Sequence, residues 1–307
     1  MRTAILDFGT NTFNLLIAEL TGNTFRRIYT GKQPVKLGKG GINEGLITED
    51  AMKRGLTAIA RHMETIADYD VDEVTSYATS AFRNATNGKA FARTIEKQFG
   101  FTVHIIPGDE EADLIYRGIR TSVAFGNDKA MIMDIGGGSN ELIICDEQQV
   151  FWKQSFELGM ARILERFTLS DPITIQEKEA IETYFRSGLQ RLFEKAREYR
   201  PKTLLGASGS FDTLAAMLRH TMGLDPDDDA PMPISLKQFA ELRDTLLSST
   251  IEERRNMPGM EPVRVEMIVP AVIFINLVVN DCGIQSIVQS DYALKEGVVA
   301  RRSENMK

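Results

Sequence analysis

The feature that most constrains this 307-residue sequence is a strand–turn–strand unit that occurs twice. In the first copy, an apolar strand ends at Asp7, passes through a turn at 8–12 and continues as a second apolar strand. In the second copy, an apolar strand ends at Asp134, passes through a glycine-rich turn at 135–140 and again continues as a strand. A repeated unit of this kind predicts two lobes of the same architecture.

Strands and helices alternate after each copy of the unit, which is the pattern of an α/β fold. We expect strands at 73–77, 102–106 and 203–206, and helices at 48–67, 88–99, 109–121, 176–197 and 263–280. The repeat divides the chain into an N-terminal lobe at 1–123 and a C-terminal lobe at 124–307. In this division the last helix is free to pack back against the N-terminal lobe.

Charge and hydropathy exclude several classes of protein. The net charge of -7 argues against broad binding to nucleic acid or to anionic membranes, which usually needs a basic surface. The longest apolar run, 267–279, is interrupted by Pro270 and is shorter than the roughly 18 residues of a membrane span. The N-terminus has no apolar signal core, so we expect a cytoplasmic protein. The acidic stretch 225–229 is interpreted as a solvated loop, with metal binding as the alternative.

Three turns rich in small residues suit phosphate binding. Backbone N–H groups approach phosphate oxygens closely where no Cβ intervenes, and an Asp at the preceding strand end can hold a metal ion or its water. The third turn, 206–210, opens a predicted helix, whose first amides suit an anion, although a simple helix cap explains it equally. The predicted phosphate-binding residues are Gly9, Thr10, Asn11, Thr12, Gly136, Gly137, Gly138, Ser139, Ser208 and Gly209.

Two carboxylates and one guanidinium complete the set of candidate side chains. Glu110 and Glu111 lie in the first turn of a predicted helix, where acidic residues commonly complement the helix dipole. Either residue could instead serve as the general base for a water that attacks phosphorus, and spacing alone does not choose between them. Arg83 follows a predicted strand, where it could contact a polyanion or simply lie on the surface.

Several ordered motifs together resemble those of the exopolyphosphatase/guanosine pentaphosphate phosphohydrolase (Ppx/GppA) family. This family belongs to the superfamily of actin, sugar kinases and chaperone ATPases. The motifs, which run over nearly the whole chain, are 7–13, 78–81 with Arg83 and Asn87, 108–112, 134–139 with Glu141, and 290–297.

The resemblance implies two ribonuclease H-like lobes with a site in the cleft between them. It also implies Mg²⁺-dependent hydrolysis of terminal phosphates from inorganic polyphosphate or guanosine pentaphosphate, and a homodimer. By similarity, Glu111 is the catalytic base, and Asp134 and Glu141 are metal or water ligands. Asp7 is added as a candidate metal ligand because it also lies at the end of a strand. Arg83 resembles a polyanion contact.

The sequence departs from the family pattern in three places. Asn140 replaces the usual Thr, the third turn reads Ser-Gly-Ser-Phe at 208–211 and differs from the common Gly-Gly-Thr, and Ala293 and Lys295 replace the usual Gly and Arg. The altered third turn motivates an alternative function, that of a non-catalytic alarmone or nucleotide sensor. A small-molecule kinase of the same superfamily is a further alternative.

Overall fold

The computed structural model describes residues 1–126, 128–225 and 228–305, and it confirms the predicted α/β fold. Its contacts divide the chain into two compact units. Unit 1 consists of Met1–Thr121, Gly136–Gly138 and Tyr292–Lys307, and unit 2 consists of Ser122–Ile135 and Ser139–Asp291. The last helix of the chain thus belongs to unit 1. Positions 226 and 227 of the acidic stretch lie outside the described residues.

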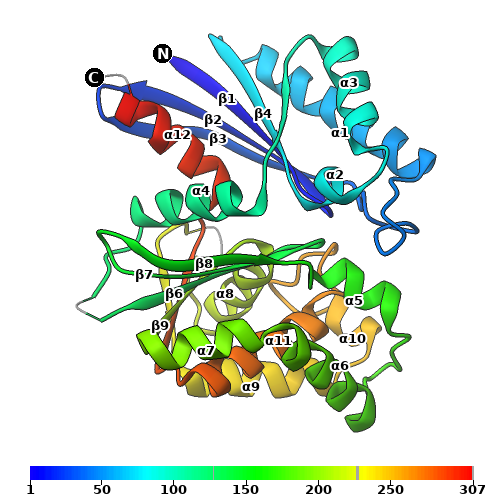
Figure 1. Cartoon of the computed structure of the whole chain (residues 1–307), viewed down its shortest axis with the longest axis vertical. Helices are drawn as coiled ribbons and strands as arrows, with labels where there is room; N and C mark the ends of the chain where they lie inside the picture. The colour runs from blue at the N-terminus through cyan, green and yellow to red at the C-terminus, as the bar shows by residue number, and fades with distance from the viewer. Residues whose placement is uncertain (127, 226–227, 306–307) are drawn as a thin grey trace. The chain divides into compact units, whose positions relative to one another are not determined.

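Unit 1 contains one five-stranded sheet with the order β3-β2-β1-β4-β5. Its elements are β1 (Arg2–Phe8), β2 (Thr12–Thr21), β3 (Thr24–Pro34), α1 (Glu49–Ala67), β4 (Glu73–Ala78), α2 (Ser80–Asn84), α3 (Gly88–Phe99), β5 (Val103–Ile105), α4 (Gly108–Arg120) and α12 (Leu294–Asn305). The first three strands pair antiparallel, whereas β4 and β5 continue the sheet in parallel to β1. Figure 1 shows α1 and α3 on one side of this sheet and α12 on the other.

Unit 2 contains a six-stranded sheet with the order β10-β11-β9-β6-β7-β8. Its elements are β6 (Ala130–Ile135), β7 (Asn140–Cys145), β8 (Val150–Phe156), α5 (Met160–Arg166), α6 (Ile175–Gly188), α7 (Gln190–Tyr199), β9 (Thr203–Ala207), α8 (Gly209–Thr221), β10 (Met232–Ile234), α9 (Leu236–Ser248), α10 (Ile251–Arg255), α11 (Ile268–Cys282) and β11 (Ser286–Ser290). In Figure 1 the helices α6, α7, α9 and α11 lie on one side of this sheet.

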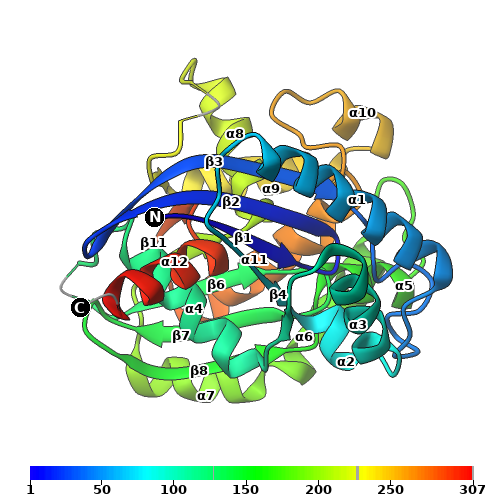
Figure 2. The same ribbon diagram turned by 90° about the horizontal axis from the view of Figure 1, so that it is seen from above.

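The two sheets repeat one strand order. Strands β8-β7-β6-β9-β11 of unit 2 follow the same path as β3-β2-β1-β4-β5 of unit 1, and β10 is an addition at the edge. Short turns join the antiparallel strands β1-β2-β3 and β6-β7-β8, whereas helices lie in the connections between the other strands. Figure 2 shows β1, β2 and β3 side by side at the start of the chain.

The pleat of β1 decides which of its residues enter the core of unit 1. Successive side chains of a strand point to opposite faces. Ala4, Leu6 and Phe8 belong to the apolar cluster that includes residues of α1 and α3. Asp7 therefore faces the opposite side of the sheet, where α12 packs against β1 and β2.

Strand β6 of unit 2 obeys the same alternation. Met131, Met133 and Ile135 belong to the apolar core that α6, α7 and α11 complete. Asp134 consequently points away from this core although it is buried, with 7% of its surface exposed. The two strand-end carboxylates thus occupy equivalent positions in the two sheets.

Two helices differ from their predicted bounds. The single helix predicted at 176–197 is two helices, α6 and α7, because the backbone leaves helical geometry at Leu189. The helix predicted at 263–280 begins only at Ile268, which puts Pro270 in its first turn, where a missing backbone N–H is tolerated. Within the described part of the chain, no helix combines the length and the apolar character that crossing a bilayer requires.

Candidate active site

The first turn of unit 1 is held in place through its carbonyl groups. The Gly9 amide donates to the Thr12 carbonyl at 3.1 Å, and the Asn11 carbonyl accepts hydrogen bonds from the amides of Val35 and Lys36 at 2.8 and 2.9 Å. Thr10 and Asn11 are buried. The turn is therefore a fixed structure whose shape the segment after β3 supports.

Gly136–Gly138 packs against this turn within unit 1. A Cβ added at Gly138 would lie 2.5 Å from Ser80 Oγ and 2.6 Å from Thr10 Oγ1, and one added at Gly137 would overlap the Asn11 side-chain amide. Only glycine allows this approach, because any larger side chain would push the two turns apart. The structure thus brings together two of the three predicted phosphate-binding turns.

Asp7 lies next to the first turn in a polar but poorly hydrated environment. Its Oδ2 accepts a hydrogen bond from Asn14 Nδ2 at 2.9 Å. Burial raises the pKa of Asp7 to about 6, and the carboxylate of Glu296 adds to this, whereas the hydrogen bond from Asn14 and the charge of Lys295 act in the opposite direction. Asp7 is therefore a carboxyl group that changes charge near neutral pH.

The structure separates the two candidate bases on α4. Glu111 is 7% exposed, and its Oε2 accepts a hydrogen bond from Arg83 Nη1 at 2.8 Å. Glu110 instead pairs with Arg301 of α12, whose Nη1 lies 2.9 Å from Glu110 Oε1. Adjacent residues of a helix point in directions about 100° apart, which explains how neighbours acquire different partners. Arg83 Nη1 also donates to the Ile106 carbonyl at 3.1 Å.

Asp134 and Glu141 form a pair of carboxylates in unit 2. They are directly opposite each other in the antiparallel ladder of β6 and β7, so their side chains lie on the same face. Glu141 is 2% exposed, and its Oε1 accepts hydrogen bonds from Ser139 Oγ at 2.8 Å and from Ser155 Oγ at 2.6 Å. The hydroxyl groups hold Glu141 in one orientation.

This pair is chemically suited to Mg²⁺. The residues that the structure describes include no group of three or more His, Cys, Asp or Glu side chains placed to hold a metal ion. Mg²⁺, however, usually takes one or two carboxylates and completes its octahedron with waters and substrate phosphates. Asp134 and Glu141 meet that requirement, while Asp7 belongs to unit 1 and its predicted metal contact stays a prediction.

The third turn contains a residue with a strained backbone. Ser208 adopts φ 69° and ψ 171°, a conformation that is nearly confined to glycine. Next to it, Gly209 leaves space that the guanidinium group of Arg264 fills, and a Cβ at Gly209 would overlap that group. The turn thus combines a strained residue with a close cationic side chain.

Arg264 is a candidate that the sequence did not reveal. Its side chain is buried, and within the described residues its Nε and the nearby Ser210 Oγ have no hydrogen-bond partner. Burial lowers the pKa of Arg264, while the carboxylates of Glu261, Asp212 and Asp134 act to raise it. The Nε atom still lies 3.9 Å from a carboxylate oxygen of Glu261, an ion pair without a hydrogen bond. A buried donor without a hydrogen bond is unusual and is readily explained by an anionic ligand or water. Because Arg264 lies far along the chain from the three predicted phosphate-binding turns, no local pattern identifies it.

The remaining predicted site residues lie in or next to the turns of the repeated unit and the third turn. Thr12 begins β2, and Ser139 precedes β7. Unit 2 contains Ser139, Glu141, Ser208 and Gly209. Unit 1 contains the first turn, Arg83 and Glu111. The structure gives the contacts of these residues with other residues of the protein. The role predicted for each of them in binding or catalysis stays a prediction.

Comparisons with known proteins agree on one family. Residues 16–306 match the model of the Ppx/GppA phosphatase family. A crystal structure of an exopolyphosphatase from Cytophaga hutchinsonii ATCC 33406 is similar with a TM-score of 0.95 and 36% identity, covering 100% of this chain and 99% of that one.

Two curated relatives are more distant in sequence. A Haemophilus influenzae protein named "Putative exopolyphosphatase" is 27% identical over 99% of this chain and 92% of its own length. The guanosine-5'-triphosphate,3'-diphosphate pyrophosphatase of Photobacterium profundum is 25% identical over 99% of this chain. The chain spans 60% of the length of that second relative.

Proposed function

We propose that this chain, which belongs to the Ppx/GppA phosphatase family and is a phosphoanhydride hydrolase, removes terminal phosphates from inorganic polyphosphate or guanosine pentaphosphate. The names of the relatives support both substrates. The observation that carries the proposal is the buried Glu111, which Arg83 holds at 2.8 Å in the same unit as the two packed glycine turns.

Glu111 acts as the general base in this proposal. Its carboxylate accepts a proton from a water molecule as the water oxygen forms a bond to the terminal phosphorus and the anhydride P–O bond breaks. The hydrogen bond from Arg83 to Oε2 orients the carboxylate. A positioned general base of this kind commonly accelerates a reaction by about 10²- to 10⁴-fold.

The turns supply donors for the phosphate oxygens. Amides of 10–12 and of Gly136–Gly138 lie in turns that the contacts described above hold in place, so they need little reorganisation when charge develops in the transition state. Arg264, whose Nε has no hydrogen-bond partner within the described residues, adds a cation beside the third turn. These groups offset the repulsion between an anionic substrate and a protein of net charge -7.

Asp134 and Glu141 are the residues that would hold Mg²⁺. When bound, the ion would neutralise charge on the substrate phosphates and orient them. The serine hydroxyls that donate to Glu141 would keep one of its oxygens in a fixed place, as partners of metal ligands commonly do.

The test compares phosphate release by the wild-type protein, Glu111→Gln and Glu110→Gln. Substrates are short and long polyphosphate and guanosine pentaphosphate, each with Mg²⁺. We expect Glu111→Gln to lose about 10²- to 10⁴-fold in turnover because Gln cannot accept the proton. Glu110→Gln is the matched control, because Glu110 pairs with Arg301 instead of Arg83, and it should remain near wild type.

Near-normal turnover of Glu111→Gln would refute the assignment of the base. Absence of phosphate release from every substrate by the folded wild-type protein would refute the proposed substrates.

A further inference from the structure

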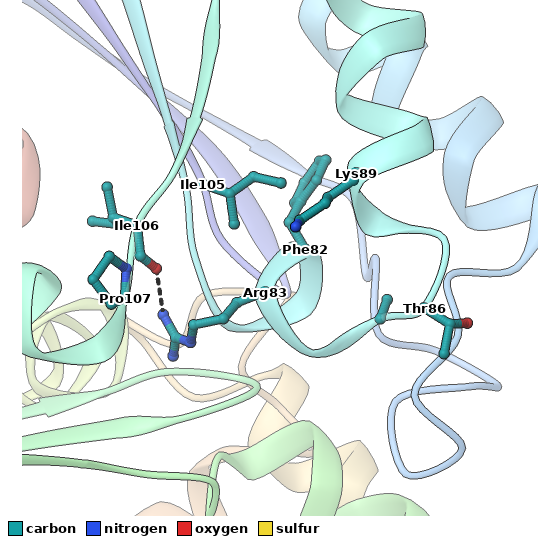
Figure 3. A pocket seen from close by; sticks show the side chains of 8 residues that line it. Phe82, Arg83, Thr86, Lys89, Ile105, Ile106 and Pro107 are labelled. Atoms are coloured by element: carbon teal, nitrogen blue, oxygen red, sulfur yellow. Dashed lines mark hydrogen bonds between the residues drawn. The ribbon is translucent and has the colours of Figure 1, made fainter.

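A pocket in unit 2 offers a ligand more accessible surface than the pocket in unit 1. The pocket of unit 1, drawn in Figure 3, is lined by Phe82, Arg83 and their neighbours. Phe82 is only 1% exposed, and Arg83 is held by the Ile106 carbonyl and by Glu111. The ring and the guanidinium group of that pocket are therefore both in use within the protein.

The pocket of unit 2 lies between α5, the segment 167–173, α10 and the start of α11. Its volume is about 370 Å³, within the range of roughly 300–1,000 Å³ that is typical of small-molecule sites. All of its lining residues belong to unit 2. They are Leu164, Phe167, Thr168, Leu169, Ser170, Asp171, Ile173, Ile251, Arg254, Glu266 and Val269.

Apolar side chains form most of the wall of this pocket. Leu164, Phe167, Leu169, Ile173 and Ile251 line it and are half-buried, so each keeps exposed surface. Apolar surface of this kind gains free energy when a ligand removes it from water. The wall therefore favours a ligand with an apolar body.

The segment that forms one side of the pocket is held in place. The Phe167 amide donates to the Ile163 carbonyl at 2.9 Å, and the Phe167 ring packs against Tyr184 with centroids 5.7 Å apart and an angle of 69° between the planes. The amide and the hydroxyl of Ser170 donate to Glu177 Oε1 at 2.9 and 2.8 Å. Because the segment is already ordered, a ligand would lose little affinity to ordering the protein.

Arg254 is the cation of the lining, and most of its donors are used inside the protein. It is 5% exposed. Its Nε donates to the Val265 carbonyl at 2.9 Å, and its Nη1 donates to the Ser249 carbonyl. Its Nη2 lies 3.5 Å from Asp171 Oδ1. Arg254 thus joins α10 to the segments around it and partly balances the charge of Asp171.

Asp171 is a carboxylate that a ligand can reach. Its side chain is 38% exposed, and its Oδ1 accepts a hydrogen bond from the Ile251 amide at 2.7 Å. Among the residues that the structure describes, no hydrogen-bond donor reaches Oδ2. Glu266, which is exposed, adds a second carboxylate to the lining. Two carboxylates against one guanidinium group favour a cation over an anion in this pocket.

We propose that this pocket binds a small apolar amine, a molecule with a hydrocarbon or aromatic body and one primary ammonium group. The body packs on Phe167, Leu169 and Ile251, and the ammonium group donates to Asp171 Oδ2, with Glu266 adding to the attraction. The bond from the Ile251 amide to Oδ1 orients the carboxylate before the ligand arrives. A charge-assisted hydrogen bond of this kind is stronger than one between neutral groups.

Binding is tested by calorimetric titration with phenethylamine and three related probes. Phenethyl alcohol has the same body without the charge, hydrocinnamate has a similar body with the opposite charge, and methylamine has the charge without the body. We expect phenethylamine to bind about tenfold more tightly than each of the others, because it alone uses both the wall and Asp171.

Asp171→Asn should weaken the binding of phenethylamine by about tenfold, because it keeps an acceptor for the Ile251 amide but removes the charge. Asp244→Asn is the matched control and should bind as the wild type does. Asp244 also pairs with an arginine, Arg243, at 2.7 Å, but it does not line the pocket. Glu266→Gln should weaken binding by about threefold, since attraction between exposed charges is worth less.

Equal affinity of Asp171→Asn and Asp244→Asn for phenethylamine would overturn the assignment of the site. Binding of hydrocinnamate or phenethyl alcohol as tight as that of phenethylamine would overturn the positive charge of the ligand, and equally tight binding of methylamine would overturn the role of the apolar wall. Should Asp171→Asn not fold, an unchanged affinity of Glu266→Gln would overturn the proposal. These titrations do not measure phosphate release, so a failure of the proposed hydrolysis would leave their result intact.

Discussion

The two copies of the strand–turn–strand unit place different residues at the same position of the ladder. In unit 1, Asp7 of β1 is opposite Asn14 of β2, and in unit 2, Asp134 of β6 is opposite Glu141 of β7. The first pair is a carboxyl group and an amide joined by a hydrogen bond of 2.9 Å. The second pair consists of two carboxylates that share one face of the sheet.

The same strand–turn–strand backbone therefore serves two different electrostatic arrangements. The amide opposite Asp7 donates a hydrogen bond to the carboxyl group, so this pair carries at most one negative charge. Two carboxylates opposite each other repel, and a cation between them removes that repulsion. We therefore expect the turn of unit 2 to be the one that depends on metal, while the turn of unit 1 mainly contributes shape and amides.

The largest effect should come from making the second pair resemble the first. Glu141→Gln keeps an acceptor for Ser139 and Ser155 but removes one of the two charges. Substitution of residues that only hydrogen-bond to metal ligands commonly lowers metal affinity or activity by about 10- to 100-fold. Substitution of a ligand itself should cost at least as much. The measurement is phosphate release as a function of Mg²⁺ concentration.

The matching change in the first pair, Asn14→Asp, serves as the contrast. It should leave the Mg²⁺ concentration for half-maximal rate nearly unchanged, although it adds a carboxylate to unit 1. If Asn14→Asp and Glu141→Gln shifted that concentration equally, the proposed division of roles between the two turns would be wrong.

A smaller effect concerns stability and pH. Folding raises the pKa of Asp7 from 3.8 to about 6, so the folded protein binds this proton more tightly than the unfolded chain. The contribution of Asp7 to stability is therefore full below pH 4 and is lost as the pH rises to about 6. Each pKa unit corresponds to about 1.4 kcal/mol, and since Asp7 keeps some exposure we expect a loss of roughly 1–3 kcal/mol.

Asp7→Asn should remove this loss. Relative to wild type, its free energy of unfolding should increase between pH 4 and pH 8 by roughly 1–3 kcal/mol, as measured by denaturant titration at both pH values. Asp50→Asn, at a side chain with 85% exposure, is the control and should follow the wild type. Parallel pH profiles for all three proteins would contradict the raised pKa of Asp7.

The smallest effect extends the comparison to the third turn. Ser208 has φ 69°, and such a conformation costs a residue with a Cβ about 1–3 kcal/mol. Ser208→Gly should relieve that strain, but glycine also has greater conformational freedom in the unfolded chain, which opposes folding. The net result should be a rise of about 1 kcal/mol in the free energy of unfolding. The measurement is denaturant unfolding of both proteins.

Ser208→Ala separates strain from the hydroxyl group. It removes the Oγ but keeps the Cβ, so it should not stabilise the protein. A gain in Ser208→Ala equal to that in Ser208→Gly would show that the hydroxyl, and not the backbone, is the source of the destabilisation.

Features that depend on neighbouring residues could be predicted from the amino-acid sequence. The alternation of strands and helices, the repeated unit and the strand-end positions of Asp7 and Asp134 all follow from local propensity and periodicity. The pleat then determines that alternate residues of β1 and β6 enter the core. These are properties of short segments, and the segments adopt the expected conformations apart from the break at Leu189 and the later start of α11.

Tertiary structure alone decided which side chains meet. Local spacing could not separate Glu110 from Glu111, whereas the packing of α4 pairs the first with Arg301 and the second with Arg83. It also brought Arg264 against Gly209 from a distant part of the sequence. The physical reason is that contacts between distant segments depend on how whole elements pack, and no pattern within one segment carries that information.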